Sequence, residues 1–316
     1  MGRCSGFCFL AVSAALCVLV ASAGGSAEGQ LPGQASAAQV VAGTIDIHVH
    51  SDPDSAKRSI DAIDIAKLAR SRGMRGIVLK NHYDPTASLA FIVRKLVPDL
   101  EVFGGIDLNL TVGGINVAAV EHMTEVSGGW GRVVWMPTFD SENQVRVSKQ
   151  NRPFVSVSRG GDLLPAVKEV ISLIARHRLV LATGHSSAEE GLMLIREARR
   201  QGVQHIVVTH AMNSPIRMTI LQMKEAAQQG AYIEFVYNSL LGSRPAFTIG
   251  EYAEAIRNVG PQFCILSSDL GQAGNPLHPD GLAAFFALLR GQGFTEAEIN
   301  RMTKENPAQL LGLTSP

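Results

Sequence analysis

Cysteine is scarce in this chain of 316 residues, which contains only four. Three of them, Cys4, Cys8 and Cys17, lie in the apolar N-terminal segment, so Cys264 alone remains in the rest of the chain. Because a single cysteine cannot form an internal disulfide, the fold must be held by a large packed core. Cys264 lies in an apolar run, which predicts a buried thiol rather than a nucleophile.

The sequence also lacks an excess of charge of one sign. It has 28 Lys and Arg against 28 Asp and Glu, and the basic residues form no stripe. This balance argues against nucleic acid and against anionic membrane surfaces as partners. The remaining partner class is a small-molecule substrate, and the sequence leaves open whether the chain forms a homo-oligomer.

The N-terminal residues have the pattern of an export signal. Arg3 gives a small positive start, residues 7–20 form an apolar run, and an A-x-A cleavage motif ends at Ala23. The run is too short for a comfortable membrane span, with an uncleaved anchor as the alternative. We therefore expect a signal peptide at 1–23, a flexible leader at 24–42, and a mature protein that is periplasmic or secreted and free of the membrane.

Beyond residue 43, eight expected strands alternate with expected helices. Capping boxes at Ser187 and Thr248 begin two of these helices, and the final helix is expected at 295–311. Most of these strands are continuous apolar runs, which is typical of parallel strands covered on both faces. The alternation, with no internal repeat and no second domain, predicts a single-domain (β/α)8 TIM barrel over residues 43–316. An open doubly wound sheet is the alternative, but no glycine-rich phosphate loop follows any strand. The strands are expected at 44–50, 76–82, 101–109, 132–139, 179–184, 205–209, 231–237 and 263–268.

One segment, residues 141–161, interrupts this rhythm. It shows little helical pattern and is rich in basic residues. Because loops on the catalytic face of a barrel are the ones that lengthen, we expect an active-site loop here. Its cations could hold a substrate carboxylate over the site, and a solvated loop is an equal alternative. They are Arg146, Lys149, Arg152 and Arg159.

The most informative short stretch is TIDIHVH at residues 44–50. It ends in His48 and His50, whose imidazoles at i and i+2 leave the same face of a strand. Neutral imidazole is the commonest protein ligand for zinc and similar ions, so this pair is half of a metal site. An isolated HxH also occurs by chance, and the positions of the other histidines decide between the two interpretations.

Five of the nine histidines fall at the carboxyl ends of expected strands, where a barrel carries its catalytic groups. They are His48, His50, His82, His185 and His210, and Asp269 closes the eighth strand. Three or four such ligands hold a catalytic divalent ion and leave a position for water. The set that provides them here is His48, His50, His185 and Asp269.

The other four histidines have ordinary structural interpretations. His122 lies on an expected helix, His177 near a helix C-terminus and His205 at the opposite end of its strand. His278, after strand eight, is expected in a solvated loop.

The order of these motifs resembles the amidohydrolase superfamily of metal-dependent hydrolases, and the details look closest to a poorly characterised bacterial branch. The resemblance covers nearly the whole mature chain, and it rests on HxH, ATGH at 182–185, VTHA at 208–211, SSDLG at 267–271 and ENPAQLLGL at 305–313. It implies a divalent ion, with zinc expected, that activates a water molecule. In that scheme Asp269 is also the acceptor of the water proton, and His210 polarises a substrate carbonyl or assists the proton transfer.

The sequence departs from the two-metal members of that superfamily at strand four. Those members carry a bridging lysine modified by carbon dioxide, or a glutamate, whereas this strand offers only Asp140. One ion is therefore expected, with two as the alternative. Lys80, His82 and His210 are the further candidate ligands, and the alternative for Lys80 is an ordinary ion pair inside the barrel mouth.

Three functional hypotheses follow. The leading one is an exported metal-dependent hydrolase that cleaves an amide, lactone or ester bond of a small molecule. The second keeps fold and metal but makes the enzyme a one-metal decarboxylase. The third is a non-catalytic metal- or ligand-binding barrel. Asp269 and His210 argue against the third, because a structural metal site is more often closed by four ligands with no spare acid or base.

Overall fold

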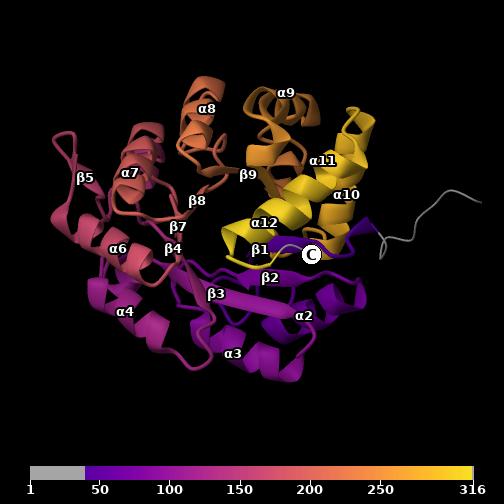
Figure 1. The fold of residues 1–316 in the computed structure, drawn as a ribbon, viewed down its shortest axis with the longest axis horizontal. Coiled ribbons are helices and arrows are strands. Elements are labelled where there is room, and N and C mark those ends of the chain that lie inside the picture. The colour runs from indigo at the N-terminus through magenta and orange to yellow at the C-terminus, as the bar shows by residue number, and fades with distance from the viewer. Residues whose placement is uncertain (1–39, 315–316) are drawn as a thin grey trace, which may run out of the picture. The chain divides into compact units, whose positions relative to one another are not determined.

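A computed structural model describes residues 40–314 of the chain (Figure 1). Its main sheet has eight parallel strands in the order β1-β2-β3-β4-β7-β8-β9-β10. The strands are β1 Ile45–Val49, β2 Gly76–Leu79, β3 Glu101–Asp107, β4 Gly131–Trp135, β7 Val180–Ala182, β8 His205–Val208, β9 Tyr232–Val236 and β10 Cys264–Ser267. Each expected strand is present, and each ends one to four residues earlier than the sequence indicated.

The sheet closes on itself where β1 meets the end of β10. Val49 and Leu270 form a parallel bridge. The Asp269 amide donates to the His48 carbonyl and the His50 amide donates to the Leu270 carbonyl, both at 3.0 Å. The expected (β/α)8 barrel is thereby confirmed, and its closing seam carries three of the expected metal ligands.

Helices surround the strands. They are α2 Ala62–Ser71, α3 Ala87–Leu96, α4 Val117–Glu125, α5 Glu142–Val147, α6 Pro165–Arg176, α7 Ala188–Arg200, α8 Ile220–Gln228, α9 Ile249–Val259, α10 His278–Gly291, α11 Glu296–Asn300 and α12 Asn306–Leu310. Capping boxes begin α7 at Ser187 and α9 at Thr248, as the sequence indicated. The final helix, expected as one piece, is divided between α11 and α12 by a π-helical turn at Arg301–Glu305.

Two apolar layers make up the core. One lies between the strands and the helices and includes Val49 and Ile65. The other is enclosed by the strands and includes Ile45 and Ile47, and α12 closes it with Leu310. Figure 1 shows α12 lying across the barrel beside β1. The floor beneath the polar site is therefore apolar.

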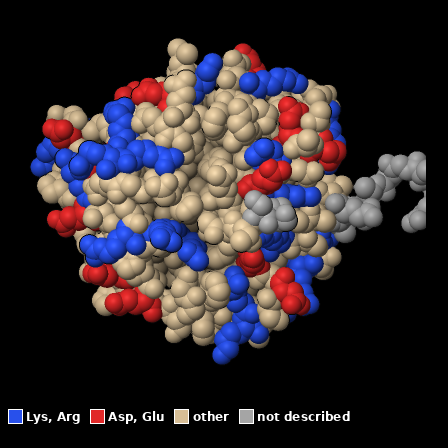
Figure 2. All heavy atoms as spheres, in the orientation of Figure 1, with Lys and Arg blue, Asp and Glu red and all other residues tan. Residues whose placement is uncertain are grey.

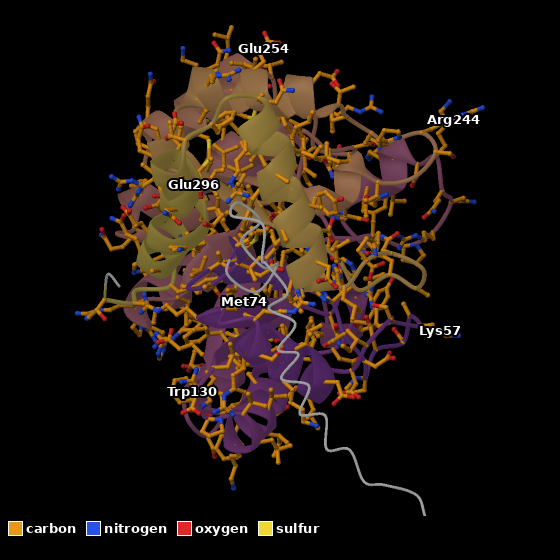
Figure 3. The ribbon with its side chains drawn as sticks, turned by 90° about the vertical axis from the view of Figure 1, so that its right-hand side faces the viewer. Lys57, Met74, Trp130, Arg244, Glu254 and Glu296 are labelled. Carbon is orange, nitrogen blue, oxygen red and sulfur yellow. The ribbon has the colours of Figure 1, made fainter. Side chains whose placement is uncertain are left out.

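The two ends of the barrel differ in what they display. In the side view of Figure 3, Lys57 and Arg244, from the loops after β1 and β9, project on one side, whereas Trp130, which precedes β4, lies toward the other. Figure 2 faces the end that carries α12, with Lys and Arg gathered over α6 and α7. These helices have basic last turns at Arg176, Arg199 and Arg200, which suits the negative end of the helix dipole.

Three expectations from the sequence need correction here. Residues 141–161 were expected to form a loop with little helical pattern, but they contain the helix α5. The hydroxyl of Ser141 accepts a hydrogen bond from the Gln144 amide and so caps this helix. The segment then leads into a hairpin formed by β5 Ser158–Arg159 and β6 Asp162–Leu163. His278, expected in a solvated loop, is instead buried in the first turn of α10, and its Nε2 donates to the Leu270 carbonyl at 2.8 Å.

The third correction concerns the leader expected at 24–42, since Val41 is already buried in the core. The expected signal peptide at 1–23 and the leader up to residue 39 lie outside the described residues. No helix within residues 40–314 is long and apolar enough to cross a membrane.

Candidate metal centre

A local irregularity in β1 brings its histidine pair into the barrel mouth. Ile45 and Ile47 belong to the apolar layer enclosed by the strands, whereas Val49 belongs to the layer outside. The pairing of β1 with β2 shifts register between Asp46 and Val49. Such a shift changes the side-chain alternation by one position, so His48 and His50 both follow Ile47 inward. Strict alternation from Ile45 would have aimed them outward.

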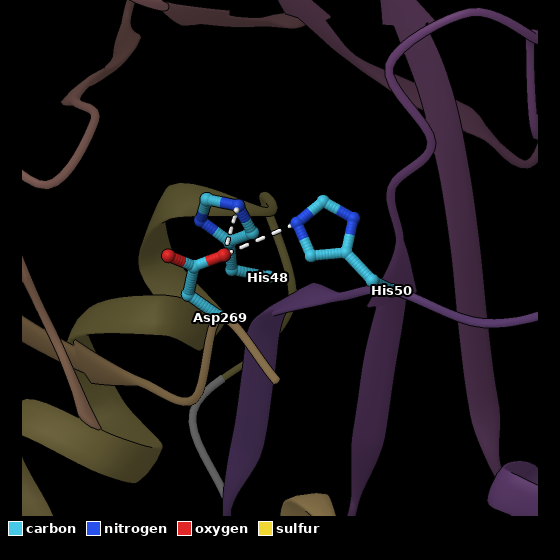
Figure 4. Close-up of side chains that lie close together, drawn as sticks. All are labelled: His48, His50 and Asp269. Carbon is cyan, nitrogen blue, oxygen red and sulfur yellow. Dashed lines mark hydrogen bonds and ion pairs between the residues drawn. The ribbon is translucent and has the colours of Figure 1, made fainter. Parts of the chain in front are cut away.

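His48, His50 and Asp269 converge on one point at the closing seam (Figure 4). The Oδ1 atom of Asp269 lies 3.3 Å from Nε2 of His48 and 3.1 Å from Nε2 of His50. All three side chains are buried. One ligand atom from each lies within 4.8 Å of the others. Two imidazole nitrogens and a carboxylate oxygen form a donor set that zinc and similar ions accept, so these residues fit a metal ion.

The far nitrogen of each imidazole is held by an acceptor. Nδ1 of His50 donates to the Lys80 carbonyl at 2.7 Å, and Nδ1 of His48 donates to Oε1 of Glu234 at 3.0 Å. A carbonyl oxygen only accepts, so the proton of His50 must sit on Nδ1. The Nε2 lone pairs then face Asp269, which is the arrangement that metal-ligating histidines require.

His185 and His210 stand beside this group. Their ring centroids are 5.0 Å apart, and that of His210 is 5.8 Å from His48. Nδ1 of His185 lies 2.9 Å from Oε1 of Gln144, whereas Nδ1 of His210 is buried without a hydrogen-bond partner among the described residues. The compact group of three excludes His185, so its role as a ligand stays a prediction.

Two of these residues have unusual backbone conformations. His210 has φ +24° and Asp269 has φ +51°, both in the left-handed region that residues with a side chain rarely adopt. Strain of this kind is typical of functional sites.

Lys80 has the ion pair that the sequence left as an alternative. Its buried Nζ lies 3.0 Å from Oδ2 of Asp107. His82 contacts Thr138 through Nδ1 at 2.9 Å, and its ring centroid is 4.9 Å from that of His50. Lys80 and His82 therefore border the group of three without belonging to it, and their roles as further ligands stay predictions.

Burial keeps most of these imidazoles neutral. It lowers the pKa of His50 to about 3, and it also lowers the pKa values of His82, His185 and His210. For His48, burial opposes protonation, but the charges of Asp269 and Glu234 outweigh it and raise the pKa. Burial alone would raise the pKa of Asp269, but the neighbouring histidines hold it well below its usual range. An ionised Asp269 beside a neutral His50 favours cation binding, whereas His48 must lose a proton before its Nε2 can bind a metal ion.

Sequence reasoning missed three buried carboxylates in this region, namely Asp46, Asp107 and Glu234. Oδ1 of Asp46 accepts the amides of His48 and Ser268 at 3.1 and 3.0 Å, and burial raises the pKa of Asp46 to about 6. Each of the three is an acidic residue within a strand that is mostly apolar. That pattern was the available signal, because a buried carboxylate needs a specific partner.

The four cations of the 141–161 segment separate into distinct environments. Arg152 pairs with Asp140 at 2.5 Å, which occupies the one acidic residue offered by strand four. Lys149 is exposed. Arg146 and Arg159 line a cavity of about 590 Å³, which also includes Asn143. Its other lining residues are Glu142, Phe154, Ser156, Ser158, Gly160, Ser187 and Glu190.

This cavity borders the segment that follows β7. The Asn143 side chain donates to the His185 carbonyl at 3.0 Å, so one wall of the cavity is bonded to the end of β7. Arg146 is paired with Glu142 at 2.5 Å.

Comparison with known proteins assigns the chain to a family. The model of a family of unknown function, DUF6282, matches residues 43–234. The chain belongs to this family. The match begins before β1 and therefore includes His48 and His50. It ends within β9 and therefore does not include Asp269. No curated protein matches this DUF6282 chain.

Solved structures share its fold. An amidohydrolase from Pseudomonas aeruginosa matches with a TM-score of 0.62 and 13% identity, over 87% of this chain and 97% of that one. The organophosphorus hydrolase from Deinococcus radiodurans matches with a TM-score of 0.58 and 17% identity, over 88% and 94% of the two chains. A protein with organophosphate hydrolysis activity engineered from a weak promiscuous lactonase template gives 0.59 and 17%, over 89% and 98%. These likenesses confirm the barrel fold.

Proposed function

We propose that this protein is a metal-dependent hydrolase that cleaves an amide, lactone or ester bond of a small molecule. The observation that carries the proposal is the convergence of His48 Nε2, His50 Nε2 and Asp269 Oδ1 at the barrel mouth. A divalent ion held by these residues, zinc being the expected one, would supply a water molecule with its pKa lowered towards ~7. The names of two structural neighbours, an amidohydrolase and an organophosphorus hydrolase, agree with this chemistry.

The residues around this point have separate tasks in the proposed reaction. Asp269 uses Oδ1 towards the histidines and keeps Oδ2, which lies 3.5 Å from the Asn238 side chain, to accept a proton from the attacking water. His210, whose Nδ1 has no partner among the described residues, is the group we assign to the substrate carbonyl. His185 lies beside it and completes the proposed ligand set.

We propose further that the substrate carries a carboxylate. The cavity of about 590 Å³ that borders the His185 loop presents Arg159, for which no ion pair is found among the described residues, and the partly compensated Arg146. A guanidinium binds a carboxylate through two parallel hydrogen bonds, which would orient such a substrate.

The proposed location is the periplasm or the extracellular space. Its support is the sequence of residues 1–23, and the test is N-terminal sequencing of the protein recovered from a periplasmic or culture fraction. A start at Gly24 supports export, and an intact Met1 in the soluble cell fraction contradicts it.

Metal content and turnover test the proposed activity together. Protein purified without added metal is analysed by inductively coupled plasma mass spectrometry and screened against lactones, esters and amides in ¹⁸O-labelled water. We expect about one ion per chain and incorporation of one labelled oxygen into the product.

Other outcomes would redirect the proposal. Release of carbon dioxide without labelled oxygen would assign decarboxylation instead. Two ions would bring Lys80 and His82 into the centre. No metal after reconstitution would overturn the hydrolase and favour a binding protein.

A further inference from the structure

Glu234 connects three strands of the site. It lies in β9, between β8 and β10 in the sheet order, and β1 follows β10 across the closing seam. Oε2 accepts the backbone amide of His210, which follows β8, at 2.8 Å. Oε1 accepts the hydroxyl of Ser267 in β10 at 2.6 Å and Nδ1–H of His48 in β1 at 3.0 Å.

The surroundings of Glu234 leave its charge few other partners. The residue is buried, and the side chains beneath it are apolar, including Ile47, Trp135 and Leu310. A carboxylate over an apolar floor is costly unless it is hydrogen-bonded and paired. Among the described residues, three groups donate hydrogen bonds to Glu234: the imidazole of His48, the backbone amide of His210 and the hydroxyl of Ser267. Of these, only the imidazole is a side chain that can carry a positive charge.

We propose that Glu234 is a positioning residue, which holds the proton of His48 on Nδ1 and so directs the lone pair of Nε2 towards Asp269 and His50. The inference rests on the proposed metal centre, and it adds a residue that the sequence motifs did not indicate. The geometry explains why a carboxylate is needed. Three hydrogens, from His48, His210 and Ser267, point at two oxygens that can only accept.

A glutamine at this position cannot reproduce that arrangement. Its amide has one acceptor oxygen and one NH₂ group, which can only donate. If the oxygen faces the His210 amide, the NH₂ group meets Nδ1 of His48, which must then accept. The proton of His48 moves to Nε2 in that case, and Nε2 can no longer bind a metal. If the amide is turned round, the NH₂ group opposes the N–H of His210.

The first test is the tautomer of His48 in the metal-free full-length chain. Nitrogen-15 chemical shifts of the imidazoles are followed as the pH is raised until His48 becomes neutral, because its pKa is raised, and His48 is assigned with His48→Gln. We expect protonation on Nδ1 in the unchanged protein and a shift towards Nε2 in Glu234→Gln. The spectrum of the unchanged protein judges the proposal even if the variant fails to fold.

The second test is the affinity for Zn²⁺ and Co²⁺, measured by competition with a chromogenic chelator and by the visible spectrum of the Co²⁺ form. Glu234→Gln should weaken binding by about 10- to 100-fold. The control Ser267→Ala removes another donor to the same carboxylate but leaves the His48 contact in place, so its affinity should stay close to that of the unchanged protein.

The outcomes separate this inference from the proposed function. A His48 proton on Nε2 in the unchanged protein, or a Glu234→Gln variant with unchanged tautomer and unchanged affinity, overturns the role of Glu234 whatever the enzyme does. Nδ1 protonation that depends on Glu234, in a protein that binds Zn²⁺ but hydrolyses nothing, keeps the inference and removes the hydrolase.

Discussion

Asp269 has the most demanding position in the site. It is buried, its backbone has φ +51°, and one of its oxygens faces two imidazoles. Asp269→Asn keeps the shape but removes the charge that attracts a cation and accepts a proton. We expect loss of bound metal and a fall in kcat/KM of about 10²- to 10⁴-fold on any substrate found by screening.

The control is a histidine outside the site, His122. His122 is exposed on α4, where its Nδ1 pairs with Glu125. His122→Ala should leave metal content and kcat/KM unchanged. Retention of metal by Asp269→Asn would show that the ion, if present, binds elsewhere.

Lys80 tests the difference between a ligand and an ion pair. Its ammonium group and the Asp107 carboxylate are fully buried 3.0 Å apart. Lys80→Met leaves that carboxylate unpaired, so the free energy of unfolding of the metal-free protein should fall by about 3 to 5 kcal/mol in urea titrations. Lys80→Met with Asp107→Leu should recover much of the loss. A single variant of full stability that loses one bound ion would instead make Lys80 a ligand.

At the scale of residues, the sequence located the side chains whose position depends only on their place at the end of a strand. His48, His50 and Asp269 meet because β1 and β10 are the first and last strands of a closed barrel, which the β/α alternation predicts. Glu234 and Asp107 were missed because a single acid in an apolar strand has no periodic pattern, and its partners lie on strands distant in the chain. The sequence could not identify Asp107 as the partner of Lys80, because the packing of the folded strands brings the two residues together.

The loop after β10 is an element whose backbone decides barrel closure. Gly271 has φ +121°, and a Cβ there would lie 2.1 Å from the His50 carbonyl oxygen. Gly242 also has a positive φ, of +91°, but a Cβ there meets nothing within 4 Å. Gly242→Ala should therefore cost at most the strain of about 1 to 3 kcal/mol. Gly271→Ala should cost clearly more and displace His50 from Asp269.

Thermal unfolding and metal affinity of the two variants measure this difference. Equal destabilisation of both, with metal affinity retained, would show that the seam between β1 and β10 tolerates displacement.

The 141–161 segment is the element that we assign to substrate binding. Arg159→Ala should raise KM for a carboxylate-bearing substrate about ten-fold with little change in kcat, the effect of losing a charge-assisted contact worth roughly 1.5 kcal/mol at an exposed site. Lys149→Ala, on the same segment but outside the cavity, is the matched control. Equal effects from the two variants would indicate general attraction by the loop rather than a binding site.

Elements with strong local signals were predicted well and the others were not. The capping boxes at Ser187 and Thr248 are specified locally, since their hydrogen-bond partners are close in sequence. The apolar strands need no specific partner, since any apolar surface can bury them. The β1 bulge and the π-helical turn depend on distant neighbours, so no local pattern indicated them. Helix α5 was missed because only one of its six residues, Val145, is buried, which leaves no apolar period.

For the whole barrel, the buried histidines predict how stability depends on pH. Burial lowers the pKa of His50 to about 3 and that of His278 to about 4, and it lowers those of His82 and His185. In the unfolded chain these groups take up protons as the pH falls through ~6.5, whereas the folded chain stays neutral to lower pH. The unfolded state therefore binds more protons, and the stability present above pH ~6.5 is lost as the pH falls towards 4.

His278 allows this dependence to be measured at a residue that is not itself an expected ligand, because its Nε2 donates to the Leu270 carbonyl and a glutamine can do the same. Urea unfolding of the metal-free protein at several values between pH 7 and pH 4.5 should show a smaller slope in His278→Gln than in the unchanged chain. The difference should approach the value for one proton, about 1.4 kcal/mol per pH unit, in the window between the two pKa values. Identical slopes would mean that His278 titrates in the folded protein as it does in the unfolded one, and would contradict the lowered pKa that we attribute to its burial.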